Sequence, residues 1–239
     1  MPDAPPTCQT YPDLVRFSYA LPCLAAALGS QRKIKVVAIG SSSTQGVVPV
    51  QTGVPVLPHP PRVEMLLRKK YFGRLIDVTN RGISGQEAPE EISRFQPDVF
   101  DENPSLVIWQ VGTNAVYKDY SPDEVKAAIR VGLKWLKAHA TMDVVLMDLQ
   151  YTQAMLLKKL PQSIAIEKII SDAAAEAGVN VFNRFALMKR WVDDKVVASV
   201  TDLDDGANEH LHTGEWATNC ISQALFGAIA ERLDAAGVT

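Results

Sequence analysis

Apolar runs alternate along the chain with segments in which apolar residues recur every three to four positions. Five runs have the length and composition of β-strands: residues 33–39, 75–80, 105–111, 142–148 and 179–182. They are almost continuously apolar, which is typical of strands buried on both faces of a parallel sheet. Helices are predicted over residues 21–28, 61–71, 88–95, 163–177, 184–193 and 213–236. This alternation predicts an α/β fold, a three-layer α/β/α sandwich around a mostly parallel five-stranded sheet.

One further helix is predicted to begin at Ser121. Its first residues, Ser-Pro-Asp-Glu, combine a serine cap, a proline in the first turn and a glutamate three positions after the serine, which is the pattern of a capping box. Val125, Ile129, Leu133 and Leu136 then follow at helical spacing. In an open parallel sheet the ligand lies outside the carboxyl ends of the strands. Candidate chemistry is therefore expected in the residues that directly follow each strand.

The length of 239 residues fits one α/β domain over residues 33–239, preceded by an arm over residues 1–32 that is first rich in proline and then apolar. A composition with 47% hydrophobic and 21% charged residues excludes collagen-like, coiled-coil and disordered chains. Because the net charge is −3 and no basic stripe is present, we do not expect nucleic acid as a partner. The sequence has no run of about 18 apolar residues, so we predict no membrane span.

The three cysteines, Cys8, Cys23 and Cys220, are too few for a disulfide scaffold. The simplest interpretation is three reduced, partly buried thiols. Cys8 and Cys23 are nevertheless close enough in sequence to pair in an oxidising compartment. The first residues include no basic region, so we predict no signal peptide. The cysteines slightly favour a periplasmic or secreted location over a cytoplasmic one, and the oligomeric state stays open.

The first strand is followed by a turn of small residues, Gly-Ser-Ser-Ser-Thr-Gln-Gly, that begins at Gly40. It is not a Walker phosphate loop, because Gln45 stands where the second glycine is needed and no lysine follows. It does not fit the dinucleotide pattern either, because Ser42 replaces that pattern's second glycine. The turn can instead present a serine hydroxyl as a nucleophile at the end of the strand, or be an ordinary loop held by its own side chains.

The second and third strands are also followed by candidate residues. Asn-Arg-Gly-Ile-Ser-Gly ends at Gly85, and a glycine N–H at such a turn can donate to an oxyanion. Gly-Thr-Asn follows the third strand, and the Asn114 amide can stabilise a developing negative charge. The structural alternatives are a plain strand-to-helix turn and an asparagine that caps its loop.

Two of the four histidines, His210 and His212, lie close together near the C-terminus. Glu209 stands three residues before His212, where a carboxylate can orient the ring and stabilise the imidazolium. The His-x-His pair could also bind zinc, but no third ligand is evident, so we predict no metal. An exposed histidine pair without a role is the remaining alternative.

Taken in order, these blocks resemble the SGNH (GDSL-type) hydrolase family, from Val36 to the final helix. The resemblance implies a flavodoxin-like fold of the SGNH type, with Ser42 as the nucleophile. It also implies an oxyanion hole formed by the N–H groups of Ser42 and Gly85 and by the side chain of Asn114. The most specific block is Gly-Thr-Asn after an apolar strand.

The chain departs from the family pattern at three positions: Ser41 and Ala115 replace aspartates, and Glu209 stands in place of the family's Asp-x-x-His aspartate. Two registers, that is, two alignments with the family motif, are possible. The favoured register makes His212 the base and Glu209 the acid that orients it, since Trp216 then matches the tryptophan of members that read Asp-Gly-Leu-His-Met-Asn-Asp-Trp. The alternative register makes His210 the base, with Asp205 or Asp204 as the acid across an inserted loop.

The resemblance implies a serine esterase that acts on a small acyl or acetyl ester, such as an acetylated carbohydrate, through a covalent acyl-enzyme without metal or organic cofactor. An O-acyltransferase and a non-catalytic binding module are the alternatives. The loop 47–61 and the segment 151–160 follow strand ends, so we expect them to line the pocket. Trp109 and Tyr117 could stack on a sugar or pack an acyl chain, although Trp109 sits in an apolar strand and fits the core equally well.

Overall fold

In the computed structural model, which describes residues 5–49, 53–157, 159–207 and 209–238, a five-stranded sheet forms the centre of the chain. The strands are β1 (Lys33–Gly40), β2 (Leu75–Gly82), β3 (Leu106–Gln110), β4 (Asp143–Met147) and β5 (Asn180–Phe182). Their order is β2-β1-β3-β4-β5 and every pairing is parallel. The predicted strands and the predicted fold class are confirmed, with a sheet that is entirely parallel.

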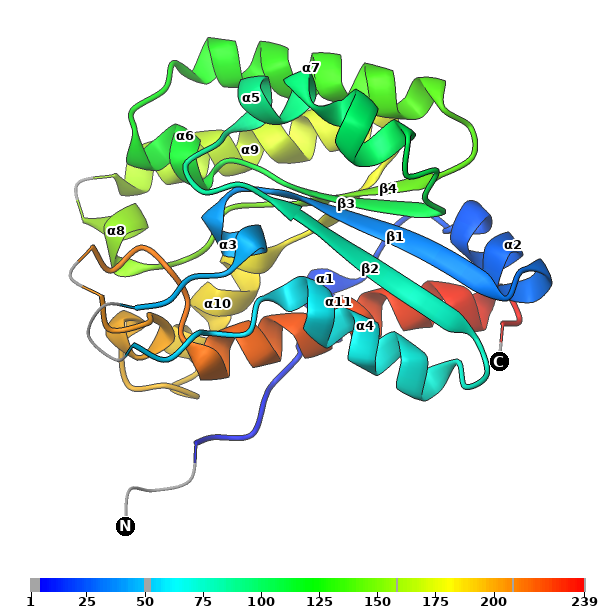
Figure 1. Cartoon of the computed structure of the whole chain (residues 1–239). Coiled ribbons are helices and arrows are strands. Elements are labelled where there is room, and N and C mark those ends of the chain that lie inside the picture. Colours follow the sequence, from blue (N-terminus) through cyan, green and yellow to red (C-terminus); the bar gives the residue numbers. More distant parts are fainter. Residues whose placement is uncertain (1–4, 50–52, 158, 208, 239) are drawn as a thin grey trace.

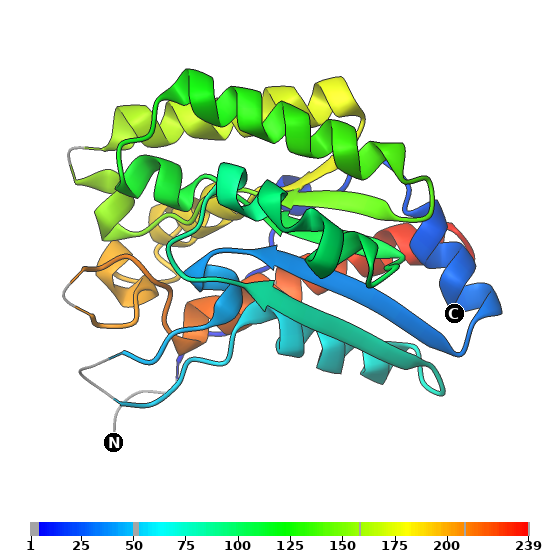
Figure 2. The same cartoon turned by 45° about the horizontal axis from the view of Figure 1, so that its top comes forward.

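Helices cover both faces of the sheet (Figure 1). One face packs against α1 (Pro12–Val15), α2 (Pro22–Ser30), α4 (His59–Lys70), α10 (Arg184–Asp193) and α11 (Glu215–Ala235). The other packs against α5 (Ala88–Ser93), α6 (Thr113–Tyr117), α7 (Pro122–Ala138) and α9 (Leu160–Ala177). Figure 2 shows the second layer from nearer its own side, with α7 running across the sheet. None of the helices in the described part of the chain is long and apolar enough to cross a membrane.

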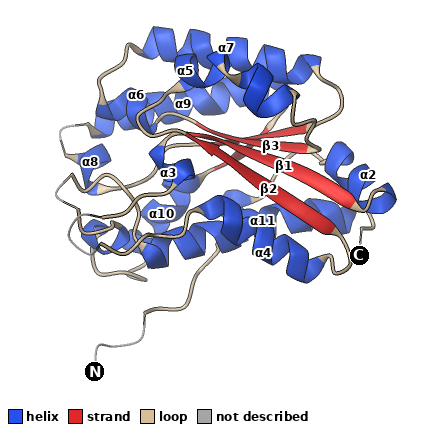
Figure 3. Ribbon diagram, in the orientation of Figure 1, coloured by secondary structure: helices blue, strands red, loops and turns tan. Residues whose placement is uncertain are grey.

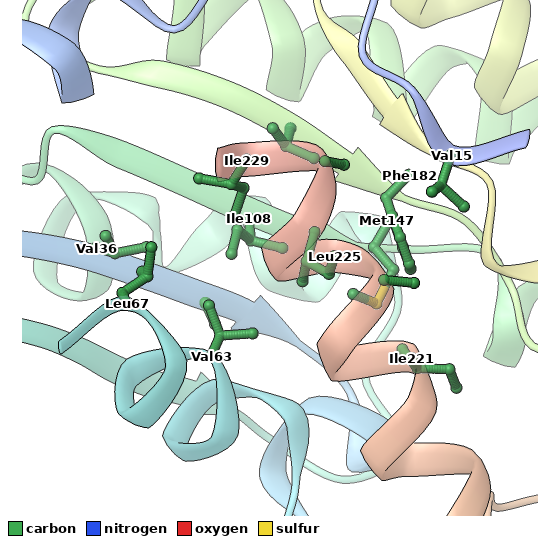
Figure 4. Close-up of a cluster of buried hydrophobic side chains, with 14 of the residues drawn as sticks. Val15, Val36, Val63, Leu67, Ile108, Met147, Phe182, Ile221, Leu225 and Ile229 are labelled. Carbon is green, nitrogen blue, oxygen red and sulfur yellow. The ribbon is translucent and has the colours of Figure 1, made fainter. Parts of the chain in front are cut away.

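The three central strands, β1, β3 and β4, divide their side chains between two cores. On β1, Val36 belongs to the core under α4 and α11, whereas Val37 belongs to the core under α5 and α7. The same alternation places Ile108 of β3 against α11, as Figure 4 shows. Burying an aliphatic side chain of this size stabilises the fold by about 1.5–3 kcal/mol. The continuous apolar character of the strands thus follows from burial on both faces.

Trp109 lies entirely in the second core and does not reach the surface. Its indole N–H donates to the buried carboxylate of Glu91 at 2.6 Å. Helix α7 passes directly over the ring at Gly132, where a Cβ would lie 2.2 Å from the indole. The core interpretation of Trp109 is therefore correct, and the residue is not available to stack on a sugar.

Short helices and turns lie at the end of the sheet toward which the strands point (Figure 3). They are α3 (Ser42–Gln45), α8 (Gln153–Leu156) and the 3-10 turn η2 (Val200–Leu203), besides α6. A π-helical turn, η1 (Gln96–Phe100), follows α5 on the second layer. Helices of four or five residues offer too little periodicity to be predicted from sequence.

The predicted capping box at Ser121 is wrong. Ser121 is the N-cap of α7, but its exposed side chain makes no capping hydrogen bond, since water can satisfy the amides of an exposed first turn. A reciprocal box forms instead at the start of α5, where Glu87 and Glu90 each accept a backbone N–H of the helix start.

The interpretation of three reduced thiols is wrong, and so is the alternative in which Cys8 pairs with Cys23. Cys8 forms a disulfide with Cys220 of α11, and Cys23 is the free cysteine of the three. The arm passes along α10 and α11, because the indole N–H groups of Trp191 and Trp216 donate to the carbonyls of Gln9 and Pro6. Cys23 lies on α2, where its thiol contacts the carbonyl of Ala140, so sequence proximity to Cys8 does not become spatial proximity. The domain boundary at residue 32 stays a prediction.

Candidate active site

The turn after β1 presents Ser42 at the carboxyl end of the sheet. Ser42 is the first residue of α3, and Ser41 caps that helix in an extended conformation. The helix packs so tightly on the end of β2 that a Cβ at Gly82 would lie 2.1 Å from the backbone nitrogen of Gln45. The side chain of Asn80 donates to the carbonyl of Thr44 at 2.8 Å. The glycine and asparagine of the second block therefore hold the serine turn in place.

The buried side chain of Gln110, at the end of β3, accepts hydrogen bonds from several residues of this turn. The side-chain oxygen of Gln110 accepts the backbone N–H and the hydroxyl of Ser41 at 3.1 and 2.9 Å, and the hydroxyl of Ser43 at 3.0 Å. Ser41, which replaces an aspartate of the family pattern, is thus fully engaged. The serines on either side of Ser42 are held by Gln110, and the Ser42 hydroxyl faces another partner.

That partner is His212. Its Nε2 lies 2.9 Å from the Ser42 hydroxyl oxygen, although the two residues are 170 positions apart. Burial lowers the pKa of His212, while the charges of Asp205 and Glu209 oppose this shift. The ring is therefore neutral at pH 7, which is the form that can accept a proton from the serine.

The carboxylate next to the His212 ring belongs to Asp205 rather than to Glu209, whose catalytic role stays a prediction. Asp205 Oδ2 lies 3.9 Å from His212 Nδ1, and the aspartate is buried. The backbone N–H of Asp205 donates to the carbonyl of His212, and Asp204 bridges to Thr213, so the two ends of the loop run side by side. Glu209, between the two ends, is exposed to solvent, whereas Leu211 is buried. A separation of 3.9 Å is too long for a direct hydrogen bond.

His210 takes part in a separate pair. Its Nδ1 lies 2.8 Å from Asp204 Oδ2, and its backbone adopts a φ of 48°. Of the five residues in the two registers, His212 thus faces Ser42 and Asp205, His210 pairs with Asp204 as the alternative register allowed, and Glu209 is exposed.

The two predicted oxyanion donors lie on turns that are bonded to each other. The Asn114 side-chain amide donates to the carbonyl of Gln86 at 2.7 Å, directly after Gly85. Gly85 has a φ of 79°, a conformation that favours glycine, and its carbonyl accepts from Lys118 at 2.6 Å. The N–H of Ser84 donates to the side chain of Gln45 on the serine turn. The structure therefore assembles the second and third blocks beside the first.

A small hollow adjoins Ser42. It measures about 10 Å³ and is lined by Ser42, Ser43, Gly46, Val47, Val56, Pro58, His212, Thr213 and Thr218. The loop 47–61 thus contributes to the pocket as expected. The segment 151–160 mainly supports the histidine loop instead, since the Thr152 hydroxyl donates to the carbonyl of Leu211 and the N–H of Ala154 to that of His210. Tyr117 lies partly exposed on α6.

The described residues include no group of three or more histidine, cysteine, aspartate or glutamate side chains that could hold a metal ion. Absence of a metal or organic cofactor from the reaction stays a prediction. The site consists of a serine, a histidine and a carboxylate, with the turns of Gly85 and Asn114 beside the serine turn. A nucleophilic acyl-transfer centre can be built from such parts.

The sequence profile of the non-GDSL lipase-like family matches residues 7–235. The chain belongs to this family. The match confirms the resemblance to SGNH (GDSL-type) hydrolases. A comparison with curated proteins gives no match.

Solved structures share the fold of this lipase-like chain at low sequence identity. An acetylxylan esterase from Geobacillus stearothermophilus is 20% identical with a TM-score of 0.67, and the match covers 82% of this chain and 94% of that one. A hydrolase from the metagenome of Lake Arreo is 17% identical with a TM-score of 0.68 over 82% and 96% of the two chains. A protein from Parabacteroides merdae that is proposed to be a GDSL-like lipase is 14% identical with a TM-score of 0.68, and the match covers 82% of this chain and 95% of that one.

Sequence reasoning considered Asp205 only as a partner of His210, although a signal for its pairing with His212 was present. The family motif Asp-Gly-Leu-His appears in this lipase-like chain as Asp205-Gly206 and Leu211-His212, with residues 207–210 inserted between its halves. The search for an acid at fixed spacing instead selected Glu209.

Arg184 was missed, and no local signal could have found it. It is buried at the start of α10, where it donates to the carbonyl of Asp148 at 2.7 Å and lies 3.4 Å from the Ser43 hydroxyl. Burial lowers its pKa to about 10, which still leaves it charged. Burial and this charge lower the pKa of His59 to about 3, so that histidine is neutral. A fixed positive charge therefore adjoins the serine turn.

Proposed function

We propose that the protein is a serine ester hydrolase of the SGNH type that acts on a small acyl or acetyl ester through a covalent acyl-enzyme. The observation that carries this proposal is the 2.9 Å contact between the Ser42 hydroxyl and His212 Nε2. It is supported by the buried carboxylate of Asp205 on the other side of the ring and by the neighbouring turns of Gly85 and Asn114.

The chemistry follows from these positions. His212 Nε2 accepts the proton of Ser42 while the serine oxygen attacks the ester carbonyl. The N–H groups of Ser42 and Gly85 and the amide of Asn114 donate to the oxyanion of the tetrahedral intermediate. His212 then gives its proton to the leaving alcohol, and water releases the acyl group by the same steps in reverse. Asp205 stabilises the imidazolium that forms in each half-reaction.

A small acyl group fits the hollow next to Ser42. Its volume of about 10 Å³ is close to the space that a single water molecule needs. An acetyl methyl is of this size, whereas a long acyl chain would have to lie outside the hollow. The structural similarity to an acetylxylan esterase supports an acetylated carbohydrate as the substrate class.

The decisive experiment compares Ser42→Ala with Ser43→Ala on p-nitrophenyl acetate. We expect Ser42→Ala to lose about 10³-fold or more of kcat and Ser43→Ala to retain most of it, because only Ser42 faces the histidine. A fluorophosphonate probe should label the wild type and Ser43→Ala but not Ser42→Ala. Hydrolysis by Ser42→Ala at the wild-type rate would refute the assignment, and a wild type that forms no adduct would indicate a non-catalytic binding module.

A panel of esters from acetyl to long acyl chains, together with acetylated xylan, tests the substrate. We expect kcat/KM to fall steeply beyond the shortest acyl groups. Acetylated products that appear when an unacetylated xylooligosaccharide is added would indicate acyl transfer rather than hydrolysis.

We also propose that the protein matures in an oxidising compartment, periplasmic or extracellular. The Cys8–Cys220 disulfide supports this proposal, since such bonds persist mainly in oxidising environments. Titration of the unreduced, denatured protein should find one free thiol, from Cys23. Three free thiols in protein isolated from its native compartment would contradict it.

A further inference from the structure

The carboxylate of Glu87 is buried between the two turns that carry the oxyanion donors. Glu87 is 1% exposed and stands at the start of α5, two residues after Gly85. One of its oxygens accepts the backbone N–H of Gly112 at 2.8 Å and that of Ala88 at 3.1 Å. The other accepts the backbone N–H of Ala115 at 2.7 Å. A single side chain thus joins the turn after β2 to the turn after β3.

These bonds surround Asn114. Gly112 and Ala115 stand on either side of it in the sequence, so Glu87 holds the backbone on both sides of Asn114. The residue before Glu87, Gln86, holds the Asn114 side chain by accepting one of its amide protons. Since an amide nitrogen carries two protons, the second stays available for an oxyanion. The position of Asn114 relative to Gly85 is therefore set through Glu87.

Glu87 also accounts for one departure from the family pattern. Ala115 stands where an aspartate often follows the asparagine, so the chain lacks a carboxylate of its own at this point. The structure supplies one from the neighbouring turn, and it bonds to the N–H of Ala115 itself.

Glu87 and Glu91 are both buried, and burial raises the pKa of each. Glu87 accepts three backbone N–H groups, which favour its ionised form and oppose this rise. Glu91, one turn further along α5, has its pKa raised well above the usual value by burial and by the charge of Glu87. Glu91 accepts the indole N–H of Trp109 and makes no contact with either oxyanion turn among the bonds of the described residues.

We propose that Glu87 is a positioning residue for the oxyanion hole, whose carboxylate sets Asn114 and Gly85 at the separation that the tetrahedral intermediate requires. This inference rests on the proposed esterase function. Glu87 touches no substrate, so its contribution lies in the transition state and not in substrate binding.

The test compares Glu87→Gln with the matched control Glu91→Gln on p-nitrophenyl acetate. Glutamine keeps the size of the side chain, but its amide would place an N–H group opposite the N–H of Gly112 or Ala115. Removal of one oxyanion donor typically costs about 10²–10³-fold in kcat, and for a displaced donor we expect about 10–10²-fold, with KM within about threefold. Glu91→Gln, which still accepts from Trp109, should keep kcat within about threefold.

A double-mutant cycle and an inhibitor separate positioning from a merely structural role. In an Asn114→Ala background the effect of Glu87→Gln should shrink to a few-fold, because Glu87 acts through Asn114. A boronic acid, which forms a tetrahedral adduct with the serine, should bind Glu87→Gln more weakly by about the factor lost in kcat/KM. If Glu87→Gln does not fold, Glu87→Asp replaces it, with a smaller loss of about 3–10-fold expected from its shorter reach.

The outcomes distinguish this inference from the function on which it rests. A wild type that hydrolyses esters and loses activity in Ser42→Ala, together with a Glu87→Gln variant as active as Glu91→Gln, would overturn the positioning role alone. Equal losses in the two glutamine variants, or an undiminished effect in the Asn114→Ala background, would overturn it as well. A wild type without ester hydrolysis would overturn both proposals.

Discussion

The two halves of the site are held in different ways. The half that contains Ser42, Gly85 and Asn114 consists of turns that leave the sheet directly, and buried side chains join these turns to one another. The half that contains His212 is a loop over residues 204–213 that does not directly follow a strand of the sheet. It closes through the bridge between Asp204 and Thr213, and the segment after β4 supports it by bonds to the carbonyls of His210 and Leu211. In the first half buried side chains join the functional turns directly to one another, whereas in the second 3.9 Å separates the histidine from its carboxylate.

This difference assigns different tasks to the two halves. Oxyanion donors work because they are in place before the charge develops, so they need a rigid support. In the proposed mechanism the histidine exchanges protons with both the serine and the leaving alcohol, which small movements of the ring allow. A shift of about 1 Å would bring Asp205 within hydrogen-bond distance of the ring, and apo sites often tighten in this way when the substrate binds.

The largest effect is expected from the histidine itself. His212→Ala removes the base that faces Ser42 and should lower kcat by about 10⁴-fold or more, as the loss of one member of such a triad does. His210→Ala breaks only the partly buried pair with Asp204, which does not contact Ser42, and should change kcat by less than about threefold. Steady-state kinetics on p-nitrophenyl acetate measures both. Loss of activity in His210→Ala with retention in His212→Ala would reverse the assignment.

The second largest effect should come from the carboxylate. Asp205→Asn removes the buried charge beside His212 and should lower kcat by about 10²–10⁴-fold, since the imidazolium loses its stabilising partner. Glu209→Gln alters an exposed side chain whose charge acts on the ring only through solvent, and it should lower kcat by less than about threefold. The pair is a direct comparison of the acid in the structure with the acid that sequence spacing selected. A larger loss in Glu209→Gln would restore that prediction.

The same contrast explains what the sequence can and cannot predict. Ser42, Gly85 and Asn114 each stand a few residues beyond a strand, and parallel strands bring their carboxyl ends to one edge, so their assembly follows from the strand pattern. The histidine loop follows no strand, and the insertion over residues 207–210 moves the acid away from the spacing that the motif expects. Its geometry depends on long-range bonds that no local pattern encodes.

The buried supports of the site were equally beyond prediction. In the sequence, Gln110 lies near the end of an apolar strand, and Glu87 directly precedes a predicted helix. Their roles depend on which turns lie within reach of the side chain, and this is a property of the packed structure. The disulfide belongs to the same class, because Cys8 meets a cysteine 212 positions away.

A smaller effect on activity and stability is expected when one of two buried glutamines is replaced. Gln110 supports the serine half of the site, and Gln150 supports the histidine half. Gln110→Met leaves the buried donors around Ser41 and Ser43 without their shared acceptor, which should cost about 1–3 kcal/mol of unfolding free energy and roughly tenfold in kcat. Gln150→Met removes a single bond to the carbonyl of Leu211, which the Thr152 hydroxyl still serves. It should cost less in stability and change kcat by less than about threefold. Thermal melts and kinetics on both variants test whether the serine half is the more tightly fixed, and equal losses would contradict the contrast.

The smallest expected effect is a shift in the pH dependence of kcat/KM. Burial lowers the pKa of His212, so the acidic limb of the profile, where the base becomes protonated and activity falls, should have a midpoint below pH 6.5. The charges of Asp205 and Glu209 stabilise the imidazolium and raise this pKa, so removing either charge should move the limb further toward acid. Asp205→Asn should cause the larger shift because its carboxylate is buried 3.9 Å from the ring, whereas the exposed carboxylate of Glu209 is screened by water. A limb that moves toward alkali in Asp205→Asn, or one that moves only in Glu209→Gln, would show that the loop closes around the histidine differently from the arrangement described above.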